Sequence, residues 1–187
     1  FFTEETRRIA IASYYGLTSF QDDNVGKILA ALDGAGLSDA TRVIYTSDHG
    51  DNLGARGLWG KSNMYQESAG IPMIARGPGV PAGKTVATPV SLLDAYPTIL
   101  EGVGEVLTAE EKALPGASLW DIANADDDAE RAVFCEYHAV AAATGAFMIR
   151  KGRFKFVHYV DFPGQLFDLD ADPLERDDLF NDPGHAA

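Results

Sequence analysis

The residues with the clearest chemical potential are an adjacent pair, Asp48 and His49, and a single lysine, Lys61, all within the stretch TSDHGDNLGARGLWGK. A carboxylate and an imidazole that are neighbours in a turn offer one cation a hard oxygen ligand and a borderline nitrogen ligand. Two ligands do not complete a metal site, and Asp, His and Gly are also ordinary turn formers. Most lysines are solvated surface charges. The residue types alone therefore leave two interpretations open, a cation site and a solvated turn.

The place of the Asp-His pair in the chain is compatible with a site. The run RVIYTS at residues 42–47 is β-branched and aromatic, which predicts a short buried strand. Asp48 and His49 follow directly, and in open α/β sheets ligands bind at the carboxyl ends of the strands. We interpret Asp51, in the same glycine-rich loop, as a turn residue rather than a third ligand.

The elements around this loop alternate between helix and strand. Apolar residues at three- and four-residue spacings predict a helix within residues 1–36, and the Gly-Ala-Gly at 34–36 ends it. A second strand is predicted over Ile71 to Ala75, and a helix over 91–103, where Pro97 is tolerable only as a kink or near an end. This alternation predicts an α/β layer with a mostly parallel sheet over residues 1–104.

The second half of the chain has a different pattern. Residues 105–131 are polar and irregular, with an exposed acidic loop expected at 126–128. Three later segments alternate in the manner of strands, and Lys151 with Gly152 suits a hairpin turn between the last two. These segments are AVFCEYHAV, AFMIRKG and RFKFVHYV, and the tail QLFDLDADPLERDDLF adds one short strand with Asp-rich turns. We therefore expect residues 105–187 to form a linker and a small antiparallel sheet.

Composition excludes several classes of protein. The chain has 187 residues, 46% of them hydrophobic, which is enough for one globular domain with a core or one domain with a small appendage. Asp and Glu outnumber Lys and Arg by 28 to 15, which argues against nucleic acid as a partner. No apolar run reaches the roughly 18 residues of a membrane span. The single cysteine, Cys135, excludes a disulfide within the chain and C-x-x-C zinc sites, and weakly favours the cytoplasm.

Taken in order, SDHGD, GLWGK, YQES and IPMIARGPG resemble the sulfatase family within the alkaline phosphatase superfamily. The resemblance extends to VSLLDAYPTIL, GASLW and QLFDLDADPLERDDL, and so covers nearly the whole chain. The Asp-His pair, together with FCEYHA and FMIRKGRFKFVHY, is most similar to the choline-sulfatase and phosphonate monoester hydrolase branch.

The resemblance implies a fold and a set of roles. The fold would be the alkaline-phosphatase-like α/β class, with a mostly parallel sheet flanked by helices and a small antiparallel C-terminal sheet. Asp48 and His49 would bind a divalent metal, Ca²⁺ in most sulfatases and Mn²⁺ or another transition metal in phosphonate hydrolases. Lys61 would be catalytic, contacting the sulfate oxygens and the leaving oxygen. His138 is a further candidate for substrate binding, with a structural histidine as the alternative.

The family's nucleophile is absent from the sequence. It is a cysteine or serine in C/S-x-P-x-R that is oxidised to formylglycine, and Cys135 in FCEYHAV has neither the proline nor the arginine. We interpret Cys135 as a strand residue. The chain opens at Phe1 rather than Met, and we expect a formylglycine in an upstream part. The chain would then be the C-terminal part of a sulfatase, inactive alone.

The expected partners are a small anionic ester, the N-terminal part of the same enzyme and a second copy in a homo-oligomer, with no nucleic acid and no membrane. The compartment would be cytoplasmic or periplasmic. Two alternatives stay open: a phosphonate monoester or phosphodiester hydrolase, and a non-catalytic binding module.

Tyr65 and Glu67 would support Lys61 through hydrogen bonds, although Glu67 is as well suited to pair with an arginine. Trp59 would be either a pocket wall for a quaternary ammonium or a packed side chain.

Overall fold

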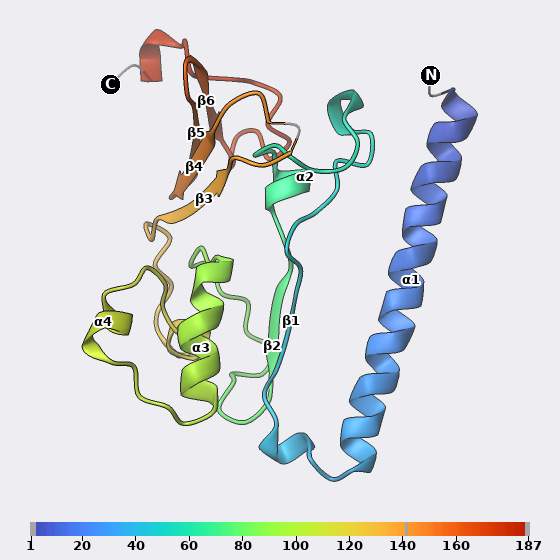
Figure 1. Ribbon diagram of the computed structural model, residues 1–187, viewed down its shortest axis with the longest axis vertical. Coiled ribbons are helices and arrows are strands. Elements are labelled where there is room, and N and C mark those ends of the chain that lie inside the picture. Colours follow the sequence, from blue (N-terminus) through green and yellow to red (C-terminus); the bar gives the residue numbers. More distant parts are fainter. Residues whose placement is uncertain (1–2, 141, 186–187) are drawn as a thin grey trace.

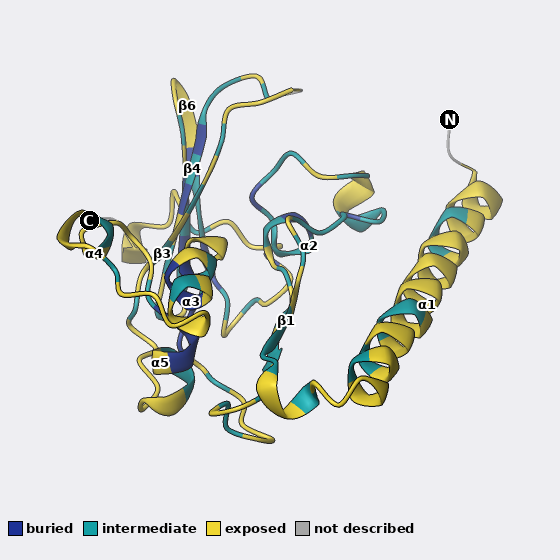
Figure 2. Cartoon of the chain, turned by 60° about the horizontal axis from the view of Figure 1, so that its bottom comes forward, coloured by how far each residue is buried: buried dark blue, intermediate teal, exposed yellow. Residues whose placement is uncertain are grey.

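The computed structural model describes residues 3–140 and 142–185. A long helix opens the chain, α1 (Glu4–Gly34), capped by the Thr3 hydroxyl, which accepts from the backbone N–H of Thr6. This confirms the predicted helix. None of its residues is buried, and α1 stands apart from the other elements in both views (Figures 1 and 2). No helix among the described residues is long and apolar enough to cross a membrane.

A pair of short strands follows the helix. The segments in order are η1 (Ser38–Ala40), β1 (Val43–Thr46), η2 (Ala55–Gly57), α2 (Gln66–Ala69) and β2 (Met73–Arg76). The strands β1 and β2 run antiparallel, with Val43 opposite Arg76 and Thr46 opposite Met73. Between these two strands the pairing is thus antiparallel, although residues 1–104 were predicted to contribute to a mostly parallel sheet. The connection between the strands holds only single helical turns, and without a full crossover helix the chain reverses direction and pairs antiparallel.

Helices cover the middle of the chain, including the segment predicted to be irregular. They are η3 (Leu92–Asp94), α3 (Ala95–Gly102), α4 (Ala109–Lys112) and α5 (Leu119–Asn124). Pro97 is the third residue of α3, in the first turn and so near an end of the helix, as expected. The prediction of irregular structure over 105–131 was wrong for α4 and α5. The Ser118 side chain caps α5, and Trp120 is buried with its indole N–H donating to the Thr98 carbonyl over 2.9 Å, so tertiary burial stabilises a helix of only six residues.

The C-terminal part forms the predicted antiparallel sheet. Its strands are β3 (Val133–Tyr137), β4 (Ala146–Lys151), β5 (Phe154–Tyr159) and β6 (Phe162–Asp168), adjacent in that order, and η4 (Pro183–His185) follows. Gly152 has a φ of 56° in the tight turn between β4 and β5, which confirms the hairpin. The expected short tail strand is β6, a full edge strand of seven residues.

The core of this sheet receives a side chain from the first half of the chain. Met64, which follows Lys61 by three residues, is 2% exposed and packs against Ala146, Met148 and Val157. Apolar burial therefore anchors the segment after Lys61 on the C-terminal sheet. Figure 1 shows α2 at the upper end of the β1–β2 pair, beside this sheet.

Candidate active site

Asp48, His49 and Lys61 converge at the end of β1. The strand ends at Thr46, and Ser47 alone separates it from the Asp-His pair. The Asp48 carboxylate Oδ2 lies 3.4 Å from His49 Nε2, and Lys61 Nζ lies 2.5 Å from the same imidazole nitrogen. The loop of residues 48–61, called the site loop below, thus closes on itself and brings together two candidate ligands and one ammonium group.

The hydrogen bonds of His49 define its tautomer. Nδ1 lies 2.8 Å from the Gly50 carbonyl, which can only accept, so Nδ1 carries the proton. Nε2 then presents its lone pair to Lys61. A histidine that donates its other ring N–H to a backbone carbonyl is the usual form of a metal ligand.

The electrostatics of the site favour an ionised carboxylate. The pKa of Asp48 is lowered from its ordinary value: partial desolvation raises it, but the nearby His49, the backbone N–H groups and Lys61 together outweigh that effect. The Asp48 side chain is 80% exposed, and His49 is 38% exposed. Both donors are therefore accessible to an ion that approaches from outside this chain.

Asp51 and Asn52 close the site loop. Asp51 Oδ1 accepts from the backbone N–H of Leu53 over 2.7 Å and of Gly60 over 3.3 Å, as expected of a turn residue. Asn52 is 1% exposed, and both its backbone N–H and its side-chain amide donate to the Gly60 carbonyl. These bonds return the chain so that Lys61 meets His49.

The site loop contains strained backbone. Leu53 and Arg56 in the loop, and Ser62 directly after it, have φ between 47° and 84°, a region that side chains with a Cβ rarely adopt. Gly54 has a φ of 87°, and a Cβ added there would lie 3.3 Å from the Trp59 ring. Trp59 is therefore packed over the loop backbone. Clustered strain of this kind persists only where surrounding contacts over-determine the conformation, and it is typical of functional sites.

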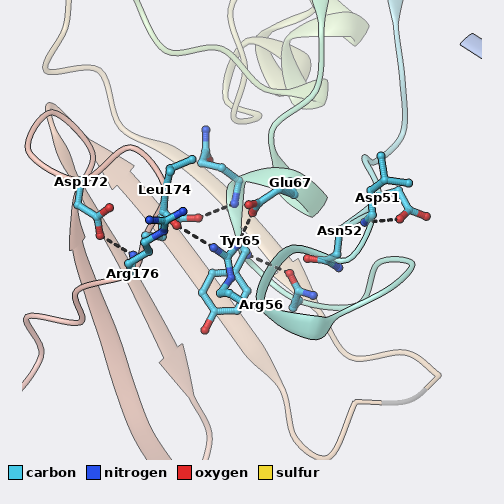
Figure 3. Close-up of polar contacts among 12 residues, drawn as sticks. Asp51, Asn52, Arg56, Tyr65, Glu67, Asp172, Leu174 and Arg176 are labelled. Carbon is cyan, nitrogen blue, oxygen red and sulfur yellow. Dashed lines mark hydrogen bonds and ion pairs between the residues drawn. The ribbon is translucent and has the colours of Figure 1, made fainter. Parts of the chain in front are cut away.

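Arg56 joins the site loop to two other segments. Its guanidinium pairs with the Glu67 carboxylate, donates to the Leu174 carbonyl over 2.7 Å and lies 3.8 Å from the centre of the Tyr65 ring (Figure 3). Glu67 thus pairs with an arginine, the second of its two predicted roles. The Tyr65 hydroxyl accepts a hydrogen bond from the Gln165 amide. Tyr65 and Glu67 therefore both contact Arg56, and neither makes the predicted hydrogen bond to Lys61 in the contacts described.

A buried ion pair that the sequence did not reveal lies behind α2. Lys155 Nζ is 2.6 Å from Glu175 Oε1, and both side chains are 0% exposed. One signal was available. In FKFVHY, Lys155 shares the inward face of the strand with Val157 and Tyr159, and a lysine on a buried face requires an internal partner.

His138 lies away from these groups. It contacts Glu136 and the edge of the Phe147 ring, and its side chain is 49% exposed. Its neighbour Tyr137, the last residue of β3, donates its hydroxyl proton to the Val140 carbonyl and accepts a 3.0 Å hydrogen bond from Ser62. The contacts described for His138 do not join it to Lys61. Cys135 is half-buried against the sheet core, and desolvation raises the pKa of its thiol.

An open pocket of about 540 Å³ borders the site loop. Ser62 and Asn63 line one side, and three tyrosines, Tyr65, Tyr137 and Tyr159, line another. Asp48, His49 and Lys61 are not among the residues that line this pocket, which adjoins the site loop through Ser62.

The donor set fits part of a metal shell. Among the described residues, no group of three or more His, Cys, Asp or Glu side chains could hold a metal ion. Asp48 supplies carboxylate oxygens and His49 supplies Nε2, whose lone pair faces the Lys61 ammonium in this structure. These donor types suit a divalent cation whose remaining ligands come from elsewhere.

Comparison with known proteins identifies relatives of the chain. The profile described as Sulfatase matches residues 2–105, and that described as N-sulphoglucosamine sulphohydrolase, C-terminal, matches residues 54–187. Choline-sulfatase of Rhizobium meliloti (strain 1021) is 38% identical over 97% of this chain and 35% of its own length. Arylsulfatase K of Danio rerio is 37% identical over 93% of this chain and 34% of its own length. The chain therefore spans about a third of the length of these relatives.

Solved structures show the same fold. The phosphonate monoester hydrolase of Silicibacter pomeroyi superimposes with a TM-score of 0.84 and 29% identity, over 98% of this chain and 39% of that one.

Proposed function

Because the chain belongs to the sulfatase family, we propose that it forms the C-terminal part of an enzyme that hydrolyses a sulfate ester. The observation that carries this proposal is the convergence of Asp48, His49 and Lys61 at the end of β1. Two curated relatives that align over almost the whole chain are sulfatases. An upstream part of a longer protein would supply the formylglycine nucleophile.

The three residues fit the demands of the reaction. Sulfate ester cleavage builds negative charge on the peripheral and leaving oxygens. Lys61 would neutralise this charge and donate a proton to the leaving oxygen, since an ammonium group is a compact charge that can release a proton. Asp48 and His49 would hold a divalent cation, Ca²⁺ if the enzyme is a sulfatase and Mn²⁺ or another transition metal if it is a phosphonate hydrolase. When bound, this cation would stabilise the negative charge as a Lewis acid.

The second candidate is a phosphonate monoester or phosphodiester hydrolase, favoured by the structural likeness to the Silicibacter pomeroyi enzyme. Its transition state also carries anionic charge, so the same side chains would serve. The tyrosine-lined pocket beside Ser62 would take the organic part of either substrate. A choline ester is one candidate, because aromatic faces attract quaternary ammonium groups.

The test uses the intact protein that contains this chain. We expect it to carry a divalent metal and an aldehyde-bearing C/S-x-P-x-R peptide, and to hydrolyse choline sulfate or an aryl sulfate faster than a phosphonate ester. Asp48→Ala should remove most of the metal, measured by atomic emission, and reduce kcat/KM by about a hundredfold or more. Asp126→Ala, in the exposed acidic loop, is the matched control and should change neither quantity.

The opposite outcomes are informative. Unchanged metal content in Asp48→Ala would support a non-catalytic module in which the Asp-His pair is only a turn. Faster hydrolysis of phosphonate esters than of sulfate esters would support the second candidate.

We further propose that the enzyme is a homo-oligomer and that it is cytoplasmic, with the periplasm as the alternative.

A further inference from the structure

Helix α2 is in direct backbone contact with the end of the site loop that carries Asp48 and His49. The N–H of Gly50, the residue after His49, donates to the Ser68 carbonyl over 2.8 Å. A Cβ added at Gly50 would lie 2.1 Å from the Glu67 carbonyl oxygen, so the two backbones touch with no side chain between them. A displacement of α2 must therefore displace Gly50 and with it the imidazole of His49.

Helix α2 has no side-chain cap of its own. Its N-cap residue is Tyr65, whose side chain makes no capping hydrogen bond, and the helix is only four residues long. Such a short helix is not stable by itself. The cap comes from the far end of the sequence: Glu175 Oε2 accepts the backbone N–H of Gln66 over 2.6 Å. A carboxylate at this position also interacts favourably with the helix dipole.

The capping carboxylate is itself held by a buried lysine. Lys155 on β5 pairs with Glu175 Oε1 and lies 3.4 Å from the side-chain oxygen of Gln66. Desolvation lowers the pKa of Lys155 and Glu175 opposes this effect, which reflects the cost of burying the ammonium group. A buried ion pair is weak evidence of a gain in stability over apolar residues, whereas this pair places a carboxylate oxygen on the backbone N–H of Gln66.

The turn that presents Glu175 is ordered and contacts the site loop a second time. Asp172 accepts the backbone N–H groups of Arg176 and Asp177, and Glu175 has a φ of 51° (Figure 3). The preceding carbonyl, that of Leu174, accepts from the guanidinium of Arg56. One turn of the C-terminal tail therefore contacts both α2 and the middle of the site loop.

We propose that Lys155 and Glu175 are positioning residues that hold His49 and Gly50 in place through α2, so that the C-terminal subdomain sets the geometry of the metal site. The positioning of the loop follows from the contacts above, whereas its meaning for metal binding rests on the proposed function. The pair does not touch substrate or metal, and its effect is transmitted by the cap on Gln66 and by the contact of α2 with Gly50.

Two double variants of the intact protein separate positioning from charge burial. Lys155→Met with Glu175→Leu replaces the ion pair by apolar side chains and removes the cap on Gln66. Lys155→Met with Glu175→Gln also removes both charges but keeps an oxygen that can accept the Gln66 N–H. Apolar replacement of a buried pair often preserves folding, so both proteins should be obtainable. A third variant, Arg131→Met, breaks the pair with buried Asp94 and is a control for loss of stability elsewhere.

The primary measurement is hydrogen exchange of the backbone amides in the peptide that contains Gly50. Metal affinity and thermal unfolding are measured on the same variants. In the Leu variant we expect exchange at Gly50 to be about tenfold faster or more and metal affinity to fall about tenfold to a hundredfold. The Gln variant should restore both toward the original protein. Arg131→Met should lower the Tm without changing exchange at Gly50.

The outcomes of this experiment and of the proposed function are distinguishable. If the original protein binds no divalent metal but the Leu variant still loses protection at Gly50, the positioning role stands and the proposed function fails. If protection at Gly50 is the same in the Leu variant as in the original protein, or is lost equally in the Gln variant and in Arg131→Met, the positioning role is overturned whatever the metal content.

Discussion

At the scale of single residues, the geometry of the site depends on the contacts of the two ring nitrogens of His49. His49 donates from Nδ1 to the Gly50 carbonyl and presents Nε2 toward Asp48 and Lys61. The ammonium of Lys61 lies 2.5 Å from His49 Nε2, the same nitrogen that Asp48 approaches to 3.4 Å. If Asp48 and His49 hold a cation as proposed, the Lys61 ammonium would lie beside an anion bound to that cation.

Substitution of Lys61 tests whether it supplies charge alone or also a proton. In the intact protein, Lys61→Ala should lower kcat on a sulfate ester by about 10² to 10³ and leave the metal content unchanged. Lys61→Arg keeps the charge, but a guanidinium does not release its proton at neutral pH. In steady-state kinetics, we expect Lys61→Arg to have a KM close to that of the original protein and a kcat as low as that of Lys61→Ala. Full recovery of kcat in Lys61→Arg would exclude the proton-donor role, and Lys112→Ala, an exposed lysine on α4, controls for loss of a positive charge.

At the scale of elements, local sequence patterns predicted what local physics determines. The β-branched run before Asp48 formed β1, and Gly152 formed the hairpin, because strand and turn propensities act over a few residues. Pairing direction and the helix α5 were not predictable in this way, since both depend on distant contacts such as that of Trp120 with Thr98. The cap on Gln66 was equally invisible, because its acceptor is Glu175, 109 residues away.

The pairing of β5 with β6 makes a prediction at high pH. Tyr159 on β5 donates from its hydroxyl to Gln165 on β6 over 2.9 Å. Burial, together with nearby Tyr65, Asp178 and Glu175, raises the pKa of Tyr159 to about 12, from an ordinary value of 10.0. The neutral form is thus favoured in the folded state, so this contribution to stability is fully present below pH 10 and is lost as the pH rises from 10 to about 12.

Two measurements check this expectation in the intact protein. Ultraviolet titration should show a tyrosine that ionises near pH 12, and Tyr159→Phe should remove that step. Denaturant unfolding between pH 10 and 12 should show a smaller loss of stability in Tyr159→Phe than in the original protein. A titration curve that Tyr159→Phe leaves unchanged would show that the raised pKa belongs to another tyrosine.

At the scale of the whole molecule, the described residues form a folded C-terminal sheet, a helical middle segment and one helix without a partner. The sheet packs against Met64, which follows the site loop, and the helical middle segment contacts the turn after β2, where the Asn124 amide donates to the Gly79 carbonyl over 3.2 Å. The helix α1 instead exposes large apolar side chains, with Leu17, Phe20 and Ile28 each 64–67% exposed. Together with a length of about a third of the curated relatives, this surface indicates that α1 is covered by a further part of the protein.

The exposed surface of α1 predicts opposite effects of the same substitutions in two contexts. The 187-residue chain expressed alone should bind a hydrophobic dye and self-associate, and Leu17→Lys with Phe20→Lys should reduce both. In the intact protein the same substitutions should lower the Tm, because each buried apolar side chain contributes about 1.5–3 kcal/mol. Asp126→Asn with Asp127→Asn matches the charge change without touching α1 and should produce neither effect. A 187-residue chain that is monomeric and binds no dye, or an intact protein whose Tm does not respond to Leu17→Lys with Phe20→Lys, would show that α1 needs no partner surface.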